Sequence, residues 1–234
     1  MRVALADDEQ ELLEQIAAIV VAAGHEIETF TNGLDLQKAL KRDTFDVVML
    51  DWNMPGMTGV DVLEWASSNL DSAPPFIMLT SRGEKNDIVR GLQSGAVDYI
   101  TKPESDEIIR ARLEAAGRRI GAKKPDQYAQ YGCYSLDRKS KSVEFNGKQV
   151  AVTAKEFDLV DLLFQNLDRP LSRSYLFSRV WGGETELETR TIDVHVSRLR
   201  TKLELQPANG FVIRTVFGFG YRMDAYIEEE TVDG

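Results

Sequence analysis

The 234-residue sequence contains few of the residues that build disulfides or zinc sites. It has one cysteine, Cys133, and two histidines. A single cysteine excludes the intrachain disulfide framework that is common in secreted proteins, so we expect a cytoplasmic location. The same shortage argues against a structural zinc site, because such sites take four ligands, mostly cysteine and histidine.

The sequence also lacks a long apolar run and an internal repeat. No stretch approaches the roughly 20 apolar residues that a membrane-spanning helix needs, so we expect no membrane insertion. The first three residues lead directly into a predicted strand, so no targeting segment is expected. The length allows one large or two medium domains, each with its own core.

The net charge of −10 is unevenly distributed. Residues 1–121 contain 12 lysine and arginine residues against 21 aspartate and glutamate residues, whereas residues 122–222 contain 16 against 12. The last twelve residues contain five acidic residues and no basic ones. The middle block could therefore bind a polyanion that the first block would repel.

A change in composition divides the chain near residue 120. The segment 117–127 has two glycines, a proline and almost no apolar residues, which is typical of a linker after a helix. We therefore predict a first domain at 1–120, a linker at 121–130, a second domain at 131–226 and a solvated acidic tail at 227–234.

Before the linker, short apolar segments alternate with amphipathic ones. Such alternation is typical of a parallel sheet with helices on both faces. The predicted strands are 2–6, 26–30, 47–50, 76–80 and 98–101. The predicted helices are about 10–23, 33–42, 59–69, 84–94 and 105–119. We expect the first domain to be α/β, with a doubly wound, five-stranded parallel sheet.

Polar residues stand at the ends of four of these strands. Asp51 ends one apolar run, and Asp7 and Asp8 follow another. Thr80 and Lys102 lie at the ends of the fourth and fifth strands. The carboxyl ends of parallel strands form the ligand-binding edge of a doubly wound sheet, so these side chains are expected to form one pocket.

The acidic part of this pocket fits a divalent cation. Mg²⁺, or Mn²⁺, takes about six oxygen ligands and retains several waters. We expect Asp8 and Asp51 to be direct ligands. Asp7 would act through water, and Asn53 would add its backbone carbonyl.

The same pocket fits a phosphoryl group. The Asp51 carboxylate could attack phosphorus and become an acyl phosphate, which Lys102 and Thr80 would stabilise. An aspartate pair after a strand is often only a helix cap with a surface charge, but joint occurrence at four strand ends favours function. An aspartyl-phosphate phosphotransferase or phosphatase would also need a cap domain and an acid–base group beside Asp51. Neither is visible, so we do not expect an enzyme.

After the linker, the pattern predicts a β-hairpin followed by three helices. The hairpin strands are 142–145 and 149–152, joined by a two- or three-residue Asn-Gly turn within Asn146-Gly147-Lys148. Thr153 and Glu156 form a capping box that opens the first helix. The second helix follows Ser172 and runs toward Trp181, and the third spans about 189–204.

The third helix has one apolar face. Its stripe comprises Ile192, Val196, Leu199 and Leu203. This helical spacing places the stripe toward the core. The other side could be an ordinary solvated face, or it could read DNA, because arginines recognise guanine edges and small side chains contact thymine methyl groups. The candidate DNA contacts are Arg190, Val194, Ser197, Arg198 and Thr201, with His195 and Arg200 on the flanks.

The first 120 residues resemble the receiver domain of two-component response regulators. The matching segments are 6–9, 50–56, 79–81 and 98–103. The resemblance implies a flavodoxin-like sheet with strand order 2-1-3-4-5. It makes Asp51 the phosphoacceptor for a cognate sensor histidine kinase. It also makes Thr80 and Tyr99 a switch pair, with a cis Lys102–Pro103 bond.

Residues 131–224 resemble the α+β winged helix-turn-helix domain of the OmpR/PhoB subfamily. The matching segments are 153–157, 190–200 and 218–222. The resemblance implies a third helix in the DNA major groove, a final hairpin that forms the wing, and head-to-tail pairs on direct repeats. Double-stranded DNA and RNA polymerase are the implied partners.

The wing departs from the pattern of that family. Phe217 stands where an arginine usually reaches the minor groove. We therefore expect Arg214 and Thr215 to make backbone contacts with DNA, and we retain Phe217 as a wing contact.

The resemblance also implies a homodimer through a face formed by helix 4, strand 5 and helix 5. Asp98 and Arg112 retain one typical charged pair of this face, whereas Ile88 and Ile108 replace another. Glu104 replaces the phenylalanine usual after Lys-Pro. We expect an apolar contact to replace one ion pair at this face, so that the stability of the dimer depends less on salt. The alternative is a constitutively dimeric DNA-binding regulator that is insensitive to phosphorylation.

Overall fold

The computed structural model describes residues 1–81, 94–118, 126–182 and 190–226. The chain forms two compact units, Met1–Lys123 and Lys124–Gly234. The predicted helix at 84–94, except for residue 94, which is in a turn, and the predicted acidic tail lie outside the described residues. Among the described residues, no helix is both long and apolar enough to span a membrane.

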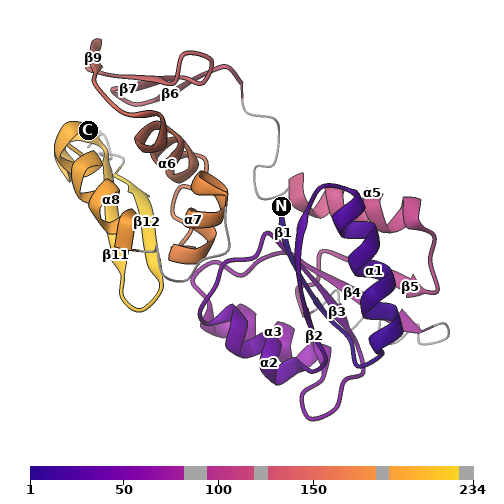
Figure 1. Ribbon diagram of the computed structural model, residues 1–234. Helices are drawn as coiled ribbons and strands as arrows, with labels where there is room; N and C mark the ends of the chain where they lie inside the picture. Colours follow the sequence, from indigo (N-terminus) through magenta and orange to yellow (C-terminus); the bar gives the residue numbers. More distant parts are fainter. Residues whose placement is uncertain (82–93, 119–125, 183–189, 227–234) are drawn as a thin grey trace, which may run out of the picture. The chain divides into compact units, whose positions relative to one another are not determined.

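The first unit is built on a five-stranded parallel sheet with the order β2-β1-β3-β4-β5 (Figure 1). This confirms the predicted α/β fold and strand order. Its strands are β1 (Arg2–Ala6), β2 (Glu26–Phe30), β3 (Val47–Asp51), β4 (Phe76–Ser81) and β5 (Asp98–Lys102). Its described helices are α1 (Gln10–Ala22), α2 (Gly33–Leu40), α3 (Gly59–Asn69) and α5 (Asp106–Arg118).

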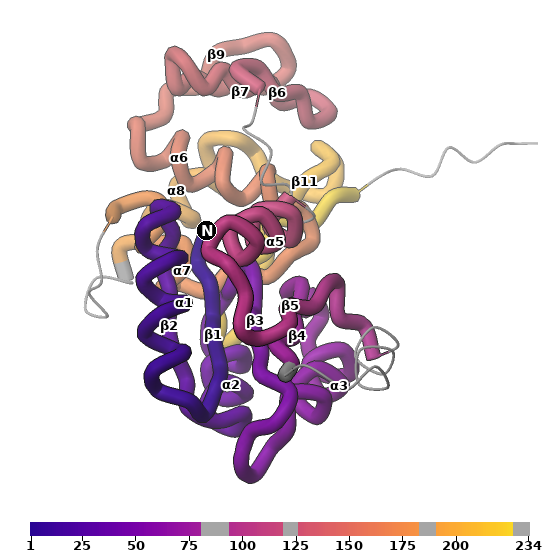
Figure 2. The backbone as a smooth tube through the Cα atoms, turned by 90° about the vertical axis from the view of Figure 1, so that its right-hand side faces the viewer, coloured from indigo at the N-terminus to yellow at the C-terminus, as the bar shows by residue number. Residues whose placement is uncertain are grey.

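Alternation along the strands divides the apolar core between the two faces of this sheet. Val3 and Leu5 pack with α1 and α5, whereas Ala4 and Ala6 pack with α2 and α3. Figure 1 and Figure 2 show the two helix pairs on opposite faces. Because both faces are covered, every residue of β3 is buried, as expected for a central strand of a parallel sheet.

The second unit begins with an antiparallel sheet of order β6-β7-β8-β9. These strands are β6 (Tyr128–Tyr131), β7 (Tyr134–Asp137), β8 (Ser142–Phe145) and β9 (Lys148–Val150). Asn146 and Gly147 both have positive φ, 52° and 72°, which fits the predicted Asn-Gly hairpin turn. Lys148 belongs to β9 rather than to the turn.

Strands β6 and β7 were not expected from the sequence. Strand β6 begins at Tyr128, inside the span 121–130 predicted as linker. Four residues of alternating exposure are too short a pattern to separate a strand from a loop. The alternation is nevertheless present, since Ala129 and Tyr131 pack against the core while Tyr128 is exposed.

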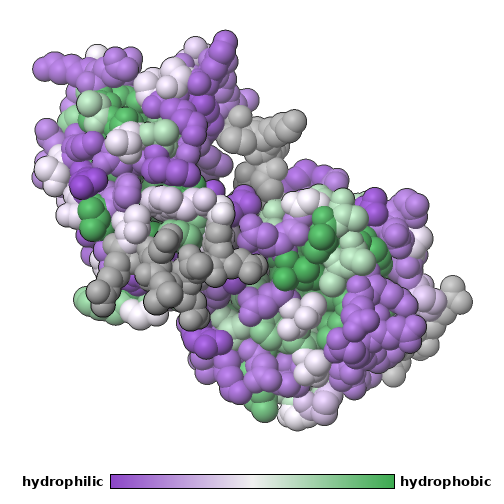
Figure 3. All heavy atoms as spheres, viewed as in Figure 1, coloured by the Kyte–Doolittle hydropathy of each residue, from purple (hydrophilic) through white to green (hydrophobic). Residues whose placement is uncertain are grey.

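Three helices and a second, three-stranded sheet complete this unit. The helices are α6 (Ala154–Phe164), α7 (Arg173–Trp181) and α8 (Arg190–Lys202), with a short 3₁₀ helix, η2 (Pro207–Asn209). The sheet has the order β10-β12-β11 and comprises β10 (Leu171–Ser172), β11 (Phe211–Val216) and β12 (Gly220–Ala225). The predicted apolar stripe of α8 is fully buried in the core. In the view of Figure 3, each unit presents hydrophilic residues interrupted by hydrophobic patches.

Candidate functional site

The predicted pocket forms at the carboxyl ends of four strands in the first unit. Asp7 follows β1, Asp51 ends β3, Thr80 lies near the end of β4 and Lys102 ends β5. Asp7, Asp51 and Thr80 are all buried, whereas Asp8 is exposed. The side chains that sequence analysis placed at separate strand ends therefore meet at one edge of the sheet.

Lys102 is the centre of this polar cluster. Its Nζ donates to Asp7 Oδ2 at 2.5 Å and also to Asp51 Oδ1, and it lies 3.9 Å from Glu9 Oε1. Burial lowers the pKa of Lys102, but its hydrogen bonds with the two aspartates outweigh this and raise the pKa overall. Lys102 is therefore a firmly charged ammonium that compensates two buried carboxylates.

Asp51 lies in a more desolvated environment than a surface carboxylate. Burial raises the pKa of Asp51, against the opposing effect of the hydrogen bond and charge of Lys102. Its second oxygen, Oδ2, accepts a hydrogen bond from the Asn53 backbone N–H at 2.8 Å. These two donors orient the carboxylate at the end of the strand.

The acidic side chains are close enough to share a cation. Asp7, Asp8 and Asp51 can each offer one oxygen, and these oxygens lie within 4.8 Å of one another. Carboxylate oxygens from separate loops are the ligands that Mg²⁺ and Mn²⁺ prefer, so the donor set fits such an ion. The Asn53 backbone lies beside the cluster, because its N–H donates to Asp51 Oδ2 at 2.8 Å, so the predicted carbonyl ligand belongs to the same edge of the sheet.

The predicted switch residues lie on the two strands beside this pocket. Thr80 is buried, and β4 pairs with β5 so that Thr80 stands opposite Thr101. Tyr99 is half-buried, and the Arg112 guanidinium lies 5.8 Å from the centre of its ring. The Lys102–Pro103 bond is cis, as predicted.

Part of the predicted dimer face is described. Arg112 on α5 donates to both carboxylate oxygens of Asp98, at 2.6 and 2.7 Å. Ile108 is 38% exposed on the same helix. Ile88 lies outside the described residues.

Gly59, the first residue of α3, has no room for a side chain beside the phosphoacceptor candidate. A Cβ there would lie 2.1 Å from the Asp51 carbonyl oxygen and 3.1 Å from its carbonyl carbon. We expect Gly59→Ala to destabilise the first unit by about 1–3 kcal/mol, because the end of β3 must move. Urea unfolding monitored by circular dichroism measures this loss.

Gly117 in α5 offers a matched control for Gly59. A Cβ there would meet Met1, 2.1 Å from its Sδ, but this is the end of a flexible side chain that can move aside. Alanine also suits a helix better than glycine, by roughly 0.5–1 kcal/mol. Equal stability losses in both variants would contradict the close approach at Gly59.

The outer side of α8 presents most of the predicted DNA contacts to solvent. Those exposed are Val194, Ser197, Arg198 and Thr201. The side chain of Arg190 lies outside the described residues. His195 is half-buried, with its ring 5.1 Å from that of Trp181 and its Nδ1 2.8 Å from the Thr191 carbonyl oxygen. His195 therefore has a packing role in addition to its place on the flank.

Arg200 connects α8 to the C-terminal hairpin. Its Nε and Nη2 donate to the Ile213 carbonyl oxygen at 3.0 and 2.6 Å, and Nη2 also donates to Thr215 Oγ1 at 3.2 Å. The Tyr221 hydroxyl reaches back from β12 to Asp193 on α8 at 2.6 Å. This connection was not predicted from the sequence, because helical spacing gives no information on which strand a long side chain reaches.

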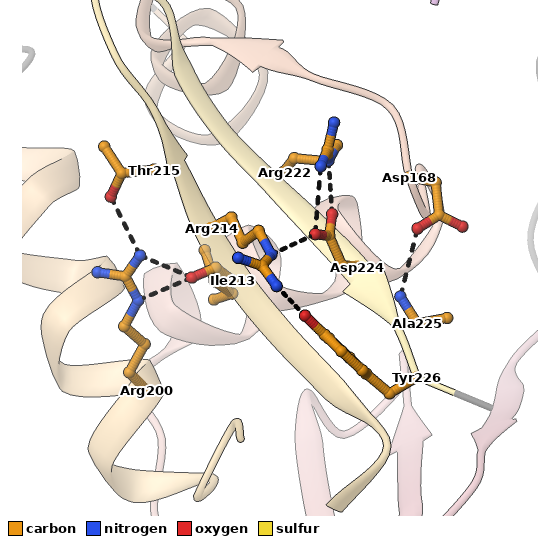
Figure 4. Close-up of polar contacts among 9 residues, drawn as sticks. All are labelled: Asp168, Arg200, Ile213, Arg214, Thr215, Arg222, Asp224, Ala225 and Tyr226. Atoms are coloured by element: carbon orange, nitrogen blue, oxygen red, sulfur yellow. Dashed lines mark hydrogen bonds and ion pairs between the residues drawn. The ribbon is translucent and has the colours of Figure 1, made fainter. Parts of the chain in front are cut away.

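The outward face of the hairpin carries a charged cluster (Figure 4). Arg214 and Arg222 stand opposite each other in the strand register. Asp224 accepts from both, with Oδ2 2.7 Å from Arg214 Nε and Oδ1 2.5 Å from Arg222 Nε. Arg214 also contacts the Tyr226 hydroxyl. Asp224 thus compensates two arginines that would otherwise repel across the strands.

Two family models match the chain. The model of the response regulator receiver domain matches residues 3–114, and the model of the transcriptional regulatory protein, C terminal, matches residues 147–223. The sensory transduction protein RegX3 of Mycobacterium tuberculosis is 37% identical over 225 residues, which cover 95% of this chain and 98% of that protein. The phosphate regulon transcriptional regulatory protein PhoB of Rhizobium meliloti is 34% identical over 225 residues, with coverage of 96% and 99%.

Among solved structures, the response regulator DrrB of Thermotoga maritima, an OmpR/PhoB homologue, is 24% identical with a TM-score of 0.46. The match covers 96% of this chain and 99% of that one. The two family models and the relatives that match over nearly their whole length decide the assignment. The chain belongs to the OmpR/PhoB family of two-component response regulators, with a receiver domain followed by a DNA-binding transcriptional regulatory domain.

Proposed function

We propose that this response regulator accepts a phosphoryl group on Asp51 from a cognate sensor histidine kinase and thereby controls its binding to DNA. One observation carries the proposal: Asp51 lies beside Lys102, Asp7 and Asp8 at one sheet edge. No other described cluster in the receiver domain combines three acids with a buried ammonium.

We assign Asp7, Asp8, Asp51 and the Asn53 carbonyl as the residues that would hold Mg²⁺ or Mn²⁺. When bound, such a cation supplies positive charge that offsets the negative charge of the reacting carboxylate and phosphoryl group. The spacing of the three carboxylates supports this assignment.

The protein's own residues provide the rest of the transfer chemistry. An Asp51 oxygen attacks phosphorus while the bond between phosphorus and the kinase histidine nitrogen breaks, and the histidine leaves. Lys102, already in contact with Asp51, compensates charge on the transferred group. The Thr80 hydroxyl can then donate a hydrogen bond to a phosphoryl oxygen. The acyl phosphate adds about −1.5 to −2 charge to the pocket.

Strand β5 is the element that can pass this change to the protein surface. It carries Lys102 in the pocket and also Tyr99 and Asp98, and Asp98 is paired with Arg112 on α5. A shift of Lys102 and Thr80 toward the phosphoryl group would therefore alter the packing of Tyr99. We propose that the resulting change favours a homodimer through helix 4, β5 and α5, with Ile108 in the contact.

The dimer would present two DNA-binding domains to direct repeats. Helix α8 would enter the major groove with Arg198 and its exposed neighbours, while the C-terminal hairpin would act as the wing. Linking two domains raises the effective concentration of the second for its half-site. A few kcal/mol of dimer stabilisation is enough to switch occupancy. RNA polymerase is the proposed downstream partner.

A footprint on target DNA tests the regulatory part of this proposal. We expect acetyl phosphate with Mg²⁺ to lower the protein concentration that protects the DNA, and to extend protection to two adjacent direct repeats. Sedimentation of beryllofluoride-treated protein should show the matching shift from monomer to dimer. Identical footprints with and without acetyl phosphate, together with a dimer in both states, would instead establish a constitutive regulator.

A further inference from the structure

Phe217 is an aromatic side chain with almost no contacts in its own domain. It is 95% exposed, whereas the next most exposed large hydrophobic residue in the described part of the chain, Tyr128, is 67% exposed. Figure 1 shows the closed end of the β11–β12 hairpin, where Phe217 lies, projecting beyond the ends of α7 and α8. A solvent-exposed phenylalanine contributes a large hydrophobic free energy to binding only when a partner buries it.

The turn that carries Phe217 is held in place by backbone hydrogen bonds and close packing at its base. The Phe219 N–H donates to the Val216 carbonyl at 3.0 Å, and Gly218 takes a positive φ of 72° that glycine adopts without strain. On the β10 side, the Arg173 N–H donates to the Phe219 carbonyl at 3.1 Å. Gly220 lies so close to Leu171 that a Cβ would stand 2.1 Å from its carbonyl oxygen.

The same hairpin is fixed to the helix proposed to read DNA. Arg200 on α8 donates three hydrogen bonds to Ile213 and Thr215 on β11. The tip therefore keeps a set position relative to α8. When α8 lies in a major groove, a hairpin tied to its side can reach the neighbouring backbone and minor groove.

The residues near the tip favour nucleic acid as the partner of Phe217. Arg214 and Thr215 are exposed just before it in the chain. Arg214 and Arg222 share the single carboxylate of Asp224, so this cluster of the hairpin keeps a net positive charge. A cation and a hydroxyl suit phosphate oxygens. The tip itself, Phe217-Gly218-Phe219, has no polar side chain that could hydrogen-bond to a base edge or a phosphate. Proteins that insert an apolar side chain between base pairs combine such a side chain with neighbouring groups that bind phosphate, and this tip has the same combination.

We propose that Phe217 is an apolar wedge that enters the minor groove next to the α8 contact and inserts partly between two base pairs. The inference rests on the proposed DNA binding and adds a mechanism of specificity to it. Pyrimidine–purine steps such as TA and CA/TG unstack most easily. The protein should therefore prefer such a step at the position that the tip reaches, and it should bend the DNA there.

The test uses the full chain and duplexes that it enriches from a random double-stranded pool. A fluorescent 2-aminopurine placed at successive positions of an enriched duplex reports unstacking. We expect the unmodified protein to raise fluorescence at one pyrimidine–purine step beside the α8 site. Phe217→Ala should abolish this rise and weaken binding to the enriched duplex by about 10- to 100-fold, the equivalent of burying one phenylalanine. Its affinity for random-sequence DNA, which depends on phosphate contacts, should not change.

Three control variants separate the wedge from other causes. Phe217→Leu should retain most of the fluorescence rise, because leucine also serves as a wedge. Tyr128→Ala removes another exposed aromatic of the same domain and should change nothing. Arg198→Ala should weaken binding yet leave the fluorescence rise intact at saturating protein. Thermal unfolding of Phe217→Ala should match that of the unmodified chain, since this side chain is exposed.

The outcomes distinguish failure of the wedge from failure of DNA binding. If the unmodified chain enriches a sequence but Phe217→Ala binds it equally and shows the same fluorescence, the wedge is wrong and the proposed function stands. If no sequence is enriched and Arg198→Ala changes nothing, the proposed DNA reading is wrong and the wedge falls with it. Loss of the fluorescence rise in Phe217→Ala and its retention in Phe217→Leu would support the wedge.

Discussion

The Asp51→Asn variant is expected to take up no phosphate from acetyl phosphate, whereas the unmodified chain forms an acyl phosphate. An amide lacks the carboxylate oxygen that attacks phosphorus. The neighbouring acids cannot substitute for it. Asp7 is completely buried, with Oδ1 bonded to the Glu9 N–H and Oδ2 to Lys102. Asp8 is exposed, and among the described ion pairs Lys102 contacts Asp7, Glu9 and Asp51 but not Asp8.

The expected loss is chemical rather than structural. Asp51 is a buried charge whose pKa burial raises, so a neutral amide of nearly the same shape removes a desolvation cost. This gain offsets the loss of one acceptor, since the amide oxygen can accept from only one of the two donors, Lys102 and the Asn53 N–H. Lys102 keeps its bond to Asp7 at 2.5 Å. Thermal unfolding should therefore show Asp51→Asn to be as stable as the unmodified receiver domain, or more stable, while its phosphorylation is lost.

Intact-protein mass spectrometry after incubation with acetyl phosphate and Mg²⁺ measures the label, and hydroxylamine treatment identifies it as an acyl phosphate. Asp46→Asn is the matched control, because Asp46 is also a buried aspartate but precedes β3 at the opposite edge of the sheet. It should keep full labelling. A hydroxylamine-sensitive label of equal extent on Asp51→Asn would place the phosphoacceptor elsewhere.

The sequence was sufficient to predict the receiver sheet and its pocket for a physical reason. Strands buried on both faces leave continuous apolar runs, and a polar residue that ends such a run must lie at the sheet edge. Asp51 was located by this rule, whereas Lys102 was located only by its place at the end of a predicted strand, and 51 positions separate the two residues in the chain. The contact between them needed only parallel strands, which alternation of strands and helices already implied.

The contacts of the DNA-binding domain could not be derived in the same way. Helical spacing identified the buried face of α8, but it did not show that Arg200 bonds to the Ile213 carbonyl. The pairing of Arg214 with Asp224 depends on the register of the hairpin, which places the two on one outward face. Antiparallel register depends on turn geometry as well as pattern. The contacts made by long polar side chains are therefore the part of this domain that could not be predicted from the sequence.

Lys102→Met is expected to destabilise the receiver domain by about 3–5 kcal/mol at neutral pH without divalent cations, because two buried carboxylates lose their compensating charge. Lys102 and both aspartates are at least 87% buried in their side chains, with exposures of 13%, 0% and 8%. Solvent can therefore replace little of the lost interaction. This loss is a large part of the 5–15 kcal/mol by which a typical domain is stable.

The pH dependence of this loss has a definite sign. Without Lys102, the hydrogen bond and charge that lower the pKa of Asp51 disappear, and burial raises the pKa further above the ordinary value of 3.8. A carboxyl whose pKa is raised in the folded state stabilises the fold below its unfolded pKa and loses that contribution as the pH rises. The stability difference between Lys102→Met and the unmodified chain should therefore be smallest near pH 4 and should grow toward pH 7.

Divalent cations should reverse much of the defect, because Asp7, Asp8 and Asp51 are spaced to share one ion and binding to the folded state alone stabilises it. Urea unfolding with Mg²⁺ or with EDTA measures this. The rise in stability on adding Mg²⁺ should be larger for Lys102→Met than for the unmodified chain, since Lys102 no longer competes for the carboxylates. Lys38→Met removes an exposed partner of Asp35 and should change nothing in either condition. If Lys102→Met matched the unmodified chain in EDTA at pH 7, Lys102 would not be the charge that holds the empty pocket together.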